Sequence, residues 1–514
     1  MNKQRLVLED ELRRYFNYTA FRLGQKEIIQ DIMNGNDVLG ILPTGSGKSI
    51  CYQLPAILLE GLTIVVSPLI SLMIDQVKQL KANNFKSVVA LNSFMERLER
   101  TRVIQNLHTY KLIYVSPELL QRADLIKHLQ NIKVSLFVID EAHCISQWGH
   151  EFRPDYLKLR STIDQLDNPI TLALSATATP HVQDDIITSL GKTNINKRIY
   201  PMDRDNIAFC VQSVSDDQEK IKTINNLMEN YRVPTLIYFS SRRTAENIAK
   251  VLSEKLPSLR IAFYHGGMDQ MDRITIQQQF MNDQLDVICC TSAFGMGINK
   301  KNIRLIIHYH FPLQIESYIQ EVGRAGRDNG ESVSLLLFSP NDIHLPLNII
   351  KNELPSESDL SFVFKHLADL YQIESKLPSK DLEMANRFKL SETQWRFLRF
   401  QFEKHDMIIQ NTIYYEKEQW ERAYDQIKAL IMKRTLFKEQ KLTEMLNWVR
   451  QKGCLRKHLF KDFQPSYRAP SHQCCSSCGF NWSEWKPVQR ATRDNLPMMW
   501  EDKLKRILLI GERQ

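Results

Sequence analysis

A glycine-rich segment near the start of the chain ends in a lysine and a serine, Lys48 and Ser49. The segment PTGSGKS (43–49) follows an apolar run at 37–42 and precedes the helical pattern CYQLPAILL. Glycines let backbone N–H groups surround phosphate oxygens, and the following helix directs its N-terminus at the anion. Lys48 would then reach the β- and γ-phosphates, and Ser49 would ligate Mg²⁺. The residues expected to hold the phosphates are Thr44, Gly45, Ser46, Gly47, Lys48 and Ser49.

Two carboxylates stand at the end of another apolar run. The segment SLFVID (135–140) places Asp140 at the end of a predicted strand, and Glu141 follows it in the sequence Asp-Glu-Ala-His. Asp140 would hold Mg²⁺ and Glu141 would polarise the attacking water. Carboxylates at strand ends can also cap helices, but a phosphate loop upstream in the same domain favours the catalytic interpretation.

Phosphoryl transfer also needs positive charge at the departing phosphate. The segment QEVGRAGRD (320–328) offers Arg324 and Arg327, which would share one face of a helix. Solvated arginine pairs are common in isolation. Because these arginines belong to a second α/β unit, their approach to ATP would link hydrolysis to domain closure. Arg327 is the preferred arginine finger, with Arg324 beside it.

These residues need two parallel sheets to position them. Short apolar runs alternate with helical patterns at 37–42, 63–67, 111–116, 135–140 and 170–174, and again at 235–240, 261–265, 286–290, 303–309 and 333–338. That rhythm is typical of βαβ units and a parallel sheet. We therefore predict an α/β fold with two tandem parallel-sheet domains, at 1–205 and 206–343.

The spacing of apolar residues becomes typical of helices after about residue 345. Segments 359–373, 379–388 and 391–408 read as three helices, the latter two each opening on a serine that could cap it, and IIQNTIYY then resembles a strand pair. Three helices followed by a β-ribbon is the order of a winged helix. An ordinary helical subdomain fits equally well. The predicted regions are 344–420, helical and winged-helix-like, and 421–514, a helical zinc-binding module.

Four of the nine cysteines gather near the C-terminus: Cys454, expected within a helix, and Cys474, Cys475 and Cys478. Such a cluster in a reducing compartment favours Zn²⁺ over disulfides, and Cys-x-x-Cys is a standard ligand spacing. His472 is an alternative to Cys474 as the fourth ligand. Cys474 is preferred because thiolates are the commoner partners in closed zinc sites.

Composition sets the remaining limits. The chain has 514 residues and a net charge of +8, which permits a polyanionic partner without requiring one. No apolar stretch reaches the length of a membrane helix, and the first residues lack a secretory signal. We expect a monomeric cytoplasmic protein, associated with the nucleoid and independent of membranes.

The ordered motifs resemble those of RecQ-type DNA helicases of superfamily 2. The matching segments are FRLGQ (21–25), PTGSGKS (43–49), VSPLISLMIDQ (66–76), DEAHCISQWGHEFRPDY (140–156), SATAT (175–179), IYFSSRRTAENIA (237–249), FYHGGM (263–268), TSAFGMGINK (291–300) and QEVGRAGRD (320–328). The resemblance covers about residues 16–340 and implies that the two α/β domains, 1–205 and 206–343, are RecA-like helicase domains. The short C-terminal part is similar to the RecS-like bacterial branch.

This resemblance implies ATP-dependent 3′→5′ unwinding of duplex DNA in repair or recombination. Gln25 would recognise adenine with support from Arg22, while Ser175 and Thr177 would connect nucleotide and DNA. Asn299 stands where the family has Asp, and Asn keeps an acceptor while losing the charge. The residues expected to contact single-stranded DNA are Trp148, Phe152, Arg153, Ser67, Ser240, Arg242 and Thr291.

The implied cofactors are ATP, Mg²⁺ and Zn²⁺, and the implied partners are single-stranded and duplex DNA with single-strand-binding or repair proteins. Two alternatives remain. An RNA helicase could carry Asp-Glu-Ala-His, although the loop ISQWGHEFRPDY favours DNA. A DNA-binding or annealing module could use ATP only to switch conformation, in which case Lys48→Ala would leave its activity intact.

Overall fold

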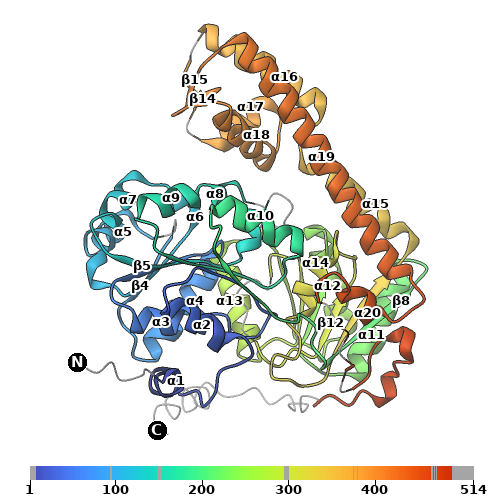
Figure 1. The fold of residues 1–514 in the computed structure, drawn as a ribbon. Coiled ribbons are helices and arrows are strands. Elements are labelled where there is room, and N and C mark those ends of the chain that lie inside the picture. The colour runs from blue at the N-terminus through green and yellow to red at the C-terminus, as the bar shows by residue number, and fades with distance from the viewer. Residues whose placement is uncertain are drawn as a thin grey trace.

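The described part of the chain forms two α/β domains, a helical head and a short cysteine-containing module (Figure 1). The computed structural model describes residues 7–92, 95–146, 153–294, 300–373, 375–378, 380–464, 467, 469–470 and 472–488. Within these residues, no helix combines the length and apolarity needed to cross a membrane.

Domain 1 is built on a parallel sheet with strand order β3-β4-β2-β5-β6-β1-β7. The predicted runs form five of its strands, whereas β3 and β7 lie outside them. The strand β7 carries the polar sequence NKRI, so its apolar content did not mark it. The strands are β1 (Val38–Ile41), β2 (Leu62–Val66), β3 (Val88–Leu91), β4 (Leu112–Val115), β5 (Val134–Ile139), β6 (Ile170–Ser175) and β7 (Asn196–Ile199).

Helices cover both faces of this sheet (Figure 1). They are α1 (Leu8–Phe16), α2 (Gln25–Met33), α3 (Ile50–Leu58), α4 (Ile70–Ala82), α5 (Arg97–Gln105), α6 (Pro117–Leu120), α7 (Ala123–Leu129), α8 (Pro154–Leu157), α9 (Leu159–Gln165) and α10 (Pro180–Leu190), with the 3₁₀ turns η1 (Leu107–Thr109) and η2 (Ala142–Ile145).

Domain 2 repeats the plan with the parallel order β10-β11-β9-β12-β13-β8. Its first strand begins at Ile207, next to the predicted boundary between residues 205 and 206. The elements are β8 (Ile207–Ser213), α11 (Asp217–Asn230), β9 (Thr235–Tyr238), α12 (Arg242–Lys255), β10 (Ile261–Tyr264), α13 (Gln270–Met281), β11 (Val287–Cys290), β12 (Leu305–His308), α14 (Ile315–Val322), β13 (Ser332–Phe338) and η3 (Pro340–Ile343).

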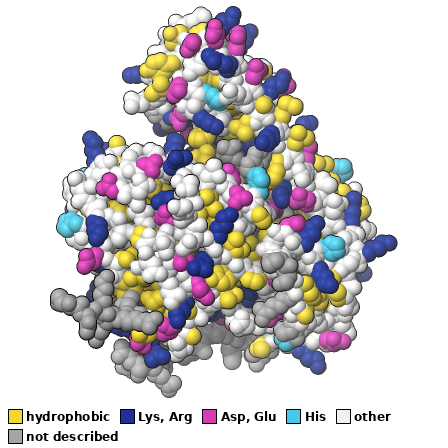
Figure 2. All heavy atoms as spheres, viewed as in Figure 1, with side chains coloured by type: hydrophobic (Ala, Val, Ile, Leu, Met, Phe, Trp, Pro, Cys, Tyr) yellow, Lys and Arg dark blue, Asp and Glu magenta, His cyan; other side chains and the backbone are white. Residues whose placement is uncertain are grey.

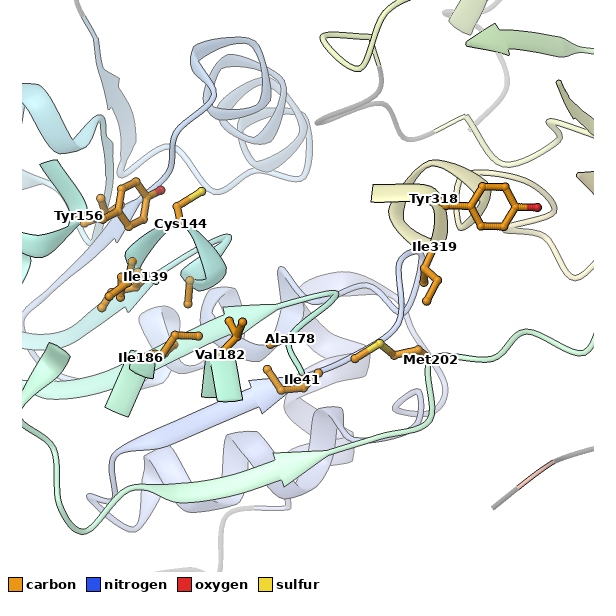
Figure 3. Packing of buried hydrophobic residues seen from close by; sticks show 14 of the residues in the cluster. Ile41, Ile139, Cys144, Tyr156, Ala178, Val182, Ile186, Met202, Tyr318 and Ile319 are labelled. Atoms are coloured by element: carbon orange, nitrogen blue, oxygen red, sulfur yellow. The ribbon is translucent and has the colours of Figure 1, made fainter. Parts of the chain in front are cut away.

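One apolar cluster runs from domain 1 into domain 2. Figure 3 shows Ile41 at the end of β1, Met202 in the linker and Ile319 on α14 within this cluster. All three side chains are at least nine-tenths buried. Burying apolar surface from both domains favours the arrangement seen here, in which the C-terminal end of α14 lies against the loop after β1.

The head, residues 354–427, has its own core. The order of three helices and an antiparallel hairpin is as predicted, and the Ser391 side chain caps α18. The N-cap of α17 is Lys380, and Ser379, the predicted cap of this helix, lies outside the described residues. The elements from the end of domain 2 through the head are α15 (His344–Glu353), α16 (Glu357–Ile373), α17 (Asp381–Phe388), α18 (Glu392–Lys404), β14 (Ile408–Ile409), β15 (Thr412–Ile413) and α19 (Lys417–Arg450).

The helix α19 connects the head to domain 2 (Figure 1). It is 34 residues long and continuous across the predicted boundary at 420. Its C-terminal half packs on α14, where the rings of Tyr318 and Trp448 are 4.7 Å apart and Lys441 Nζ lies 2.9 Å from Glu316 Oε1. The head is therefore joined directly to the helix that precedes Arg324.

The cysteine module follows α19 and consists of α20 (Leu455–Phe460), η4 (Ser476–Cys478) and η5 (Trp482–Glu484). The expectation that Cys454 lies within a helix is wrong, because α19 ends at Arg450 and Cys454 is the N-cap of α20. The module covers the edge of the second sheet, where the Phe209 N–H donates to the Cys474 carbonyl at 3.1 Å. That contact satisfies backbone groups that an open edge strand would expose.

Candidate nucleotide site between the two domains

A cavity of about 320 Å³ lies between the domains and is lined by both. Most of its wall comes from domain 1: the turn after β1, the start of α3 and the acidic end of β5. Domain 2 contributes one side. The lining residues that matter for chemistry are Arg22, Gln25, Thr44, Gly45, Gly47, Lys48, Ser49, Asp140, Glu141, Lys301, Gln320, Arg324 and Arg327.

The predicted phosphate loop takes the conformation that its sequence suggests. Gly45 and Gly47 have φ of 82° and 76°, a region that other residues rarely adopt. The loop then turns directly into α3, whose N-cap is Ser49. Ser46 lies on the same loop, and its N–H donates to the Pro43 carbonyl at 3.2 Å. Loop and helix N-terminus thus face one space, as anion binding requires.

Gln25 and Arg22 brace this loop from behind. The Gln25 amide Nε2 donates to the carbonyls of Ser46 and Gly47 at 2.8 and 2.9 Å, and Arg22 Nη1 donates to the Gly45 carbonyl at 2.6 Å. Both side chains also line the cavity. The expected role of Gln25 and Arg22 in adenine recognition stays a prediction, and the structure adds their contacts to the loop that is predicted to hold the phosphates.

The loop touches domain 2 directly. A Cβ atom placed on Gly45 would lie 2.9 Å from Arg327 Cγ, so the arginine side chain lies across the loop backbone. A Cβ on Gly323 would overlap Thr44 Oγ1. Only a residue without a side chain fits at Gly323, since the two domains meet there. Lys48 and Arg327 consequently reach one cavity from opposite walls.

Arg327 carries a buried positive charge. Burial, helped by the cations of Arg324 and Arg204, lowers the pKa of Arg327 to about 9. The guanidinium therefore keeps its charge at neutral pH. A cation held among other cations is stabilised by an incoming anion, and the terminal phosphate of ATP would supply that anion at this wall of the cavity.

The acidic side of the cavity, formed by Asp140 and Glu141, favours a cation. Burial, followed by the charge of Glu141, raises the pKa of Asp140 to about 6. A divalent cation would favour its ionised form, and oxygen donors from Asp140 and Ser49 suit Mg²⁺. Glu141 has φ of 50°, the left-handed region that a non-glycine residue enters at a cost, and such strain clusters at functional sites.

A series of polar contacts connects Glu141 with the end of β6. His143 Nδ1 lies 3.0 Å from Ser175 Oγ and 3.4 Å from Glu141 Oε2. The Thr177 N–H donates to Ser175 Oγ at 3.3 Å. Ser175 and Thr177 thus connect to the acidic pair, which is compatible with the coupling expected for them.

Arg324 and Arg327 do not share a helix face as predicted, because α14 ends at Val322 and both lie in the turn that follows. Arg204, in the linker between the domains, holds that turn. Its Nη1 donates to the carbonyls of Ala325 and Gly323 at 2.8 and 3.3 Å, and its Nη2 donates to the Gly326 carbonyl. One planar guanidinium therefore satisfies three carbonyls of one turn. Sequence reasoning missed Arg204 because its partners are backbone atoms about 120 residues away.

Lys301 and Gln320 were missed as well, although both line the cavity from domain 2. Gln320 lies in the same motif as Arg324, so the motif itself could have indicated that Gln320 lies near the nucleotide site. Lys301 lies shortly after segment 295–299, which includes Asn299 and lies outside the described residues. Its neighbour Lys300 is a structural residue, with Nζ 2.6 Å from Asp283 Oδ1.

The residues predicted to contact DNA lie at the carboxyl ends of strands. Ser67 follows β2, Ser240 follows β9, Thr291 follows β11, and Arg242 begins α12. Ligands of open parallel sheets bind at this edge. Arg153 Nη1 donates to the Pro68 carbonyl at 3.2 Å, which places it beside Ser67. Trp148 and Phe152 lie outside the described residues.

The four predicted cysteines meet. The sulfur atoms of Cys454, Cys474, Cys475 and Cys478 all lie within 4.8 Å of one another. His472 instead places Nδ1 2.9 Å from Glu331 Oε1 and is absent from this group of described residues. Four thiols at such separations suit a tetrahedral cation better than they suit an apolar core.

Comparison with known proteins identifies the class. A family model described as "DEAD/DEAH box helicase" matches residues 22–186, and one described as "Helicase conserved C-terminal domain" matches residues 219–329. The fold is similar to Lhr helicase of Mycobacterium smegmatis bound to ssDNA and AMP-PNP (TM-score 0.56, 20% identity, 80% of this chain and 61% of that one). It is also similar to the DEAD-box helicase Mss116 bound to ssRNA and UDP-BeF (TM-score 0.57, 16% identity, 90% of each chain). The predicted pair of RecA-like domains is confirmed, and with the cavity it defines a helicase-type nucleotide hydrolase.

Curated relatives are more specific. The probable ATP-dependent DNA helicase RecS of Bacillus subtilis is 40% identical over 508 residues, 97% of each protein. The ATP-dependent DNA helicase RecQ of the same organism is 44% identical over 337 residues, 65% of this chain and 56% of that protein. This chain belongs to the RecQ and RecS family of ATP-dependent DNA helicases, as the motifs predicted, and is an ATP-hydrolysing enzyme.

Proposed function

We propose that the protein moves 3′→5′ along single-stranded DNA and unwinds duplexes during repair or recombination. The observation that carries the proposal is the cavity lined by Lys48 from domain 1 and by Arg324 and Arg327 from domain 2. ATP in this cavity would hold the domains together, and loss of its terminal phosphate would weaken that hold. Alternate closing and opening along a strand produces translocation.

Each group in the cavity has a distinct task in hydrolysis. Gly45, Gly47 and Lys48 bind the phosphates, and Arg327 stabilises charge on the departing phosphoryl group. Bound Mg²⁺, held by Ser49 and Asp140, would neutralise charge on the β- and γ-phosphates. Glu141 accepts a proton from the attacking water, or orients it, in the strained position that its backbone imposes.

DNA would cross the carboxyl ends of both sheets, contacted by Ser67, Arg153, Ser240, Arg242 and Thr291 as the family motifs imply. Trp148 and Phe152, on the loop after the acidic pair, would add stacking to unpaired bases. Contacts made mostly to phosphate carry little sequence preference, and binding should weaken steeply with salt. The head would meet the duplex, a role that its helix and hairpin order suggests.

The cysteine group would hold one structural Zn²⁺ through Cys454, Cys474, Cys475 and Cys478. The fit rests on the donor set: four thiols converge in one place, and Cys475 is fully buried. A closed four-thiolate site supports folding and leaves no position open for catalysis. It would fix the module on β8, beside the linker that carries Arg204.

Strand displacement tests the proposal. Duplexes with a 3′ or a 5′ single-stranded tail are incubated with the protein, ATP and Mg²⁺, and the displaced strand is measured. We expect displacement from the 3′-tailed duplex alone. Activity confined to 5′ tails would reverse the polarity, and stronger stimulation of ATP hydrolysis by RNA than by DNA would overturn the substrate. A monomeric state, nucleoid association and single-strand-binding or repair partners belong to the same proposal.

A further inference from the structure

Arg456, the second residue of α20, carries a positive charge into the interior of the protein. Its side chain has no exposed surface. Removing a charge from water is costly unless partners inside the protein compensate for the lost hydration. The partners of Arg456 therefore indicate what this side chain holds in place.

Arg456 contacts the linker between the two domains and the start of β8. Its Nη1 forms an ion pair with Asp203 and donates to the Arg204 carbonyl at 3.1 Å, and its Nη2 donates to the Ile207 carbonyl. The guanidinium carbon also lies 4.9 Å from the ring centre of Phe209. One planar cation of the cysteine module thus holds three residues of segment 203–207.

The same linker holds the turn at 323–326, which presents the arginine finger. Arg204 donates to three carbonyls of this turn, and Asn206 Nδ2 donates to the Gly326 carbonyl at 2.9 Å. A Cβ atom on Gly326 would overlap Asn206 Nδ2, so linker and turn pack too closely for a side chain at that position. The linker consequently connects Arg456 to the turn.

The helix α20 is itself anchored on α19 and on domain 2. The Trp448 indole N–H of α19 donates to the Leu455 carbonyl at 3.0 Å. The ring of Phe460 lies 5.8 Å from that of Phe209 on β8, and α20 lies beside this strand (Figure 1). These contacts fix the helix that carries Arg456 and leave the side chain directed at the linker.

We propose that Arg456 is a positioning residue for ATP hydrolysis, which acts through Arg204 to fix the turn that carries Arg324 and Arg327. The inference rests on the proposed function, because the position of this turn matters for the rate only if Arg327 acts on the terminal phosphate. No described residue of the cysteine module lines the nucleotide cavity. The module would nevertheless control the rate of hydrolysis through Arg456.

Arg456→Lys in the full-length protein tests the proposal. Lysine keeps the charge but lacks the planar fork that reaches several partners at once. ATP hydrolysis is measured over a range of ATP concentrations at saturating oligo-dT, and rates are divided by the concentration of ADP-binding sites so that unfolded protein is not counted. We expect kcat to fall roughly tenfold, with the KM for ATP and the affinity for oligo-dT nearly unchanged.

Binding of a transition-state mimic separates positioning of the finger from support of the fold. ADP with aluminium fluoride imitates the phosphoryl group in transfer, whereas ADP alone lacks that group. The Arg456→Lys variant should bind ADP like the wild type and should bind ADP with aluminium fluoride roughly tenfold more weakly, because a misplaced arginine affects only the group that it contacts. Equal weakening of both ligands would overturn the proposal.

A double-mutant cycle tests whether Arg456 acts through Arg204. Two residues that contribute through one contact give losses that do not add. In an Arg204→Met background, Arg456→Lys should therefore lower kcat no further. A full additional loss in the double variant would show that Arg456 affects hydrolysis by a separate route, and the proposal would be wrong.

Two further variants control for damage to the buried site. Asp203→Asn keeps an acceptor for Arg456 but removes its charge, and should change kcat in the same direction by a smaller factor. Lys461→Gln, at the end of α20 with a side chain that is 64% exposed, should behave like the wild type.

The outcomes remain distinguishable from failure of the proposed function. If oligo-dT stimulates ATP hydrolysis by the wild type but Arg456→Lys and Asp203→Asn keep the wild-type kcat, this inference falls alone. A raised KM with unchanged kcat in Arg456→Lys would also overturn it. If oligo-dT does not stimulate hydrolysis by the wild type, the proposed function falls and this inference falls with it.

Discussion

The side chain of Arg327 lies across the backbone of Gly45, so the second domain reaches into the phosphate loop of the first. This contact requires glycine at 45, because a Cβ atom there would come within 2.9 Å of Arg327 Cγ. It also places the guanidinium beside the cavity that Lys48 lines from the other side. Under the proposed function, hydrolysis would therefore depend on how closely the two domains approach.

Lys48→Ala should abolish ATP hydrolysis and strand displacement while leaving DNA binding largely intact. The lysine would supply positive charge to the β- and γ-phosphates under the proposed function, whereas the expected DNA contacts lie elsewhere, at the carboxyl ends of strands. ATPase assays with and without oligo-dT, together with anisotropy on the same oligonucleotide, provide the measurement. Retained strand displacement would favour a module in which ATP only switches conformation.

Gly323→Ala should prevent full closure. The added methyl group would occupy the position of Thr44 Oγ1, and displacements of about 1 Å at a catalytic centre can cost about 100-fold in rate. We expect a loss of that order in DNA-stimulated kcat, with little change in the melting temperature. Combining it with Thr44→Gly, which removes the overlapping atoms, should recover part of the closure measured by small-angle scattering with a non-hydrolysable ATP analogue. Unchanged kcat in Gly323→Ala would show that hydrolysis does not use this arrangement.

Arg204→Met should lower kcat roughly tenfold or more while the KM for ATP changes little. The turn at 323–326 would lose the hydrogen bonds that fix Arg324 and Arg327, and hydrogen bonds to a charged donor are each worth about 1.5–3 kcal/mol. Lys255→Met, at the exposed end of α12, is the control. A rise in KM with kcat unchanged would assign Arg204 to nucleotide binding instead of positioning.

Cys475→Ser should release the metal and loosen the module from β8. Purified wild type should contain about one zinc per chain and the variant well below half of that, because a structural site needs all four ligands. His472→Gln should keep its zinc, since His472 pairs with Glu331. Zinc lost from His472→Gln but kept by Cys474→Ser would mean that the histidine is the fourth ligand.

Local patterns predicted the parts of this protein that depend on neighbours in sequence. The run before Pro43, the turn and the start of α3 are all set within about 20 residues, so strand, loop and helix were identifiable. The strand β7 was missed because its polar sequence is stabilised by pairing with β1. Basic and acidic side chains are interspersed over the face drawn in Figure 2, in keeping with the modest net charge, and surface charge therefore gave little guidance to the DNA path.

Contacts between residues far apart in the sequence could not be predicted, because no local pattern marks them. Arg204 acts on backbone carbonyls of a distant turn, and Arg456 contacts the linker from about 250 residues further along the chain. Cys454 was assigned to a helix because the apolar pattern continues through it, but α19 ends earlier and the chain turns toward the other cysteines. Tertiary packing decided these positions.

The most direct test of the account is the hydrolysis rate of Arg327→Ala at saturating oligo-dT. An arginine finger contributes about 10³–10⁵ to kcat, so we expect DNA-stimulated kcat to fall by about 10³-fold with the KM for ATP and the affinity for oligo-dT nearly unchanged. Hydrolysis by Arg327→Ala at the wild-type rate would contradict the claim that Lys48 and Arg327 act on one phosphate from opposite sides of the cleft.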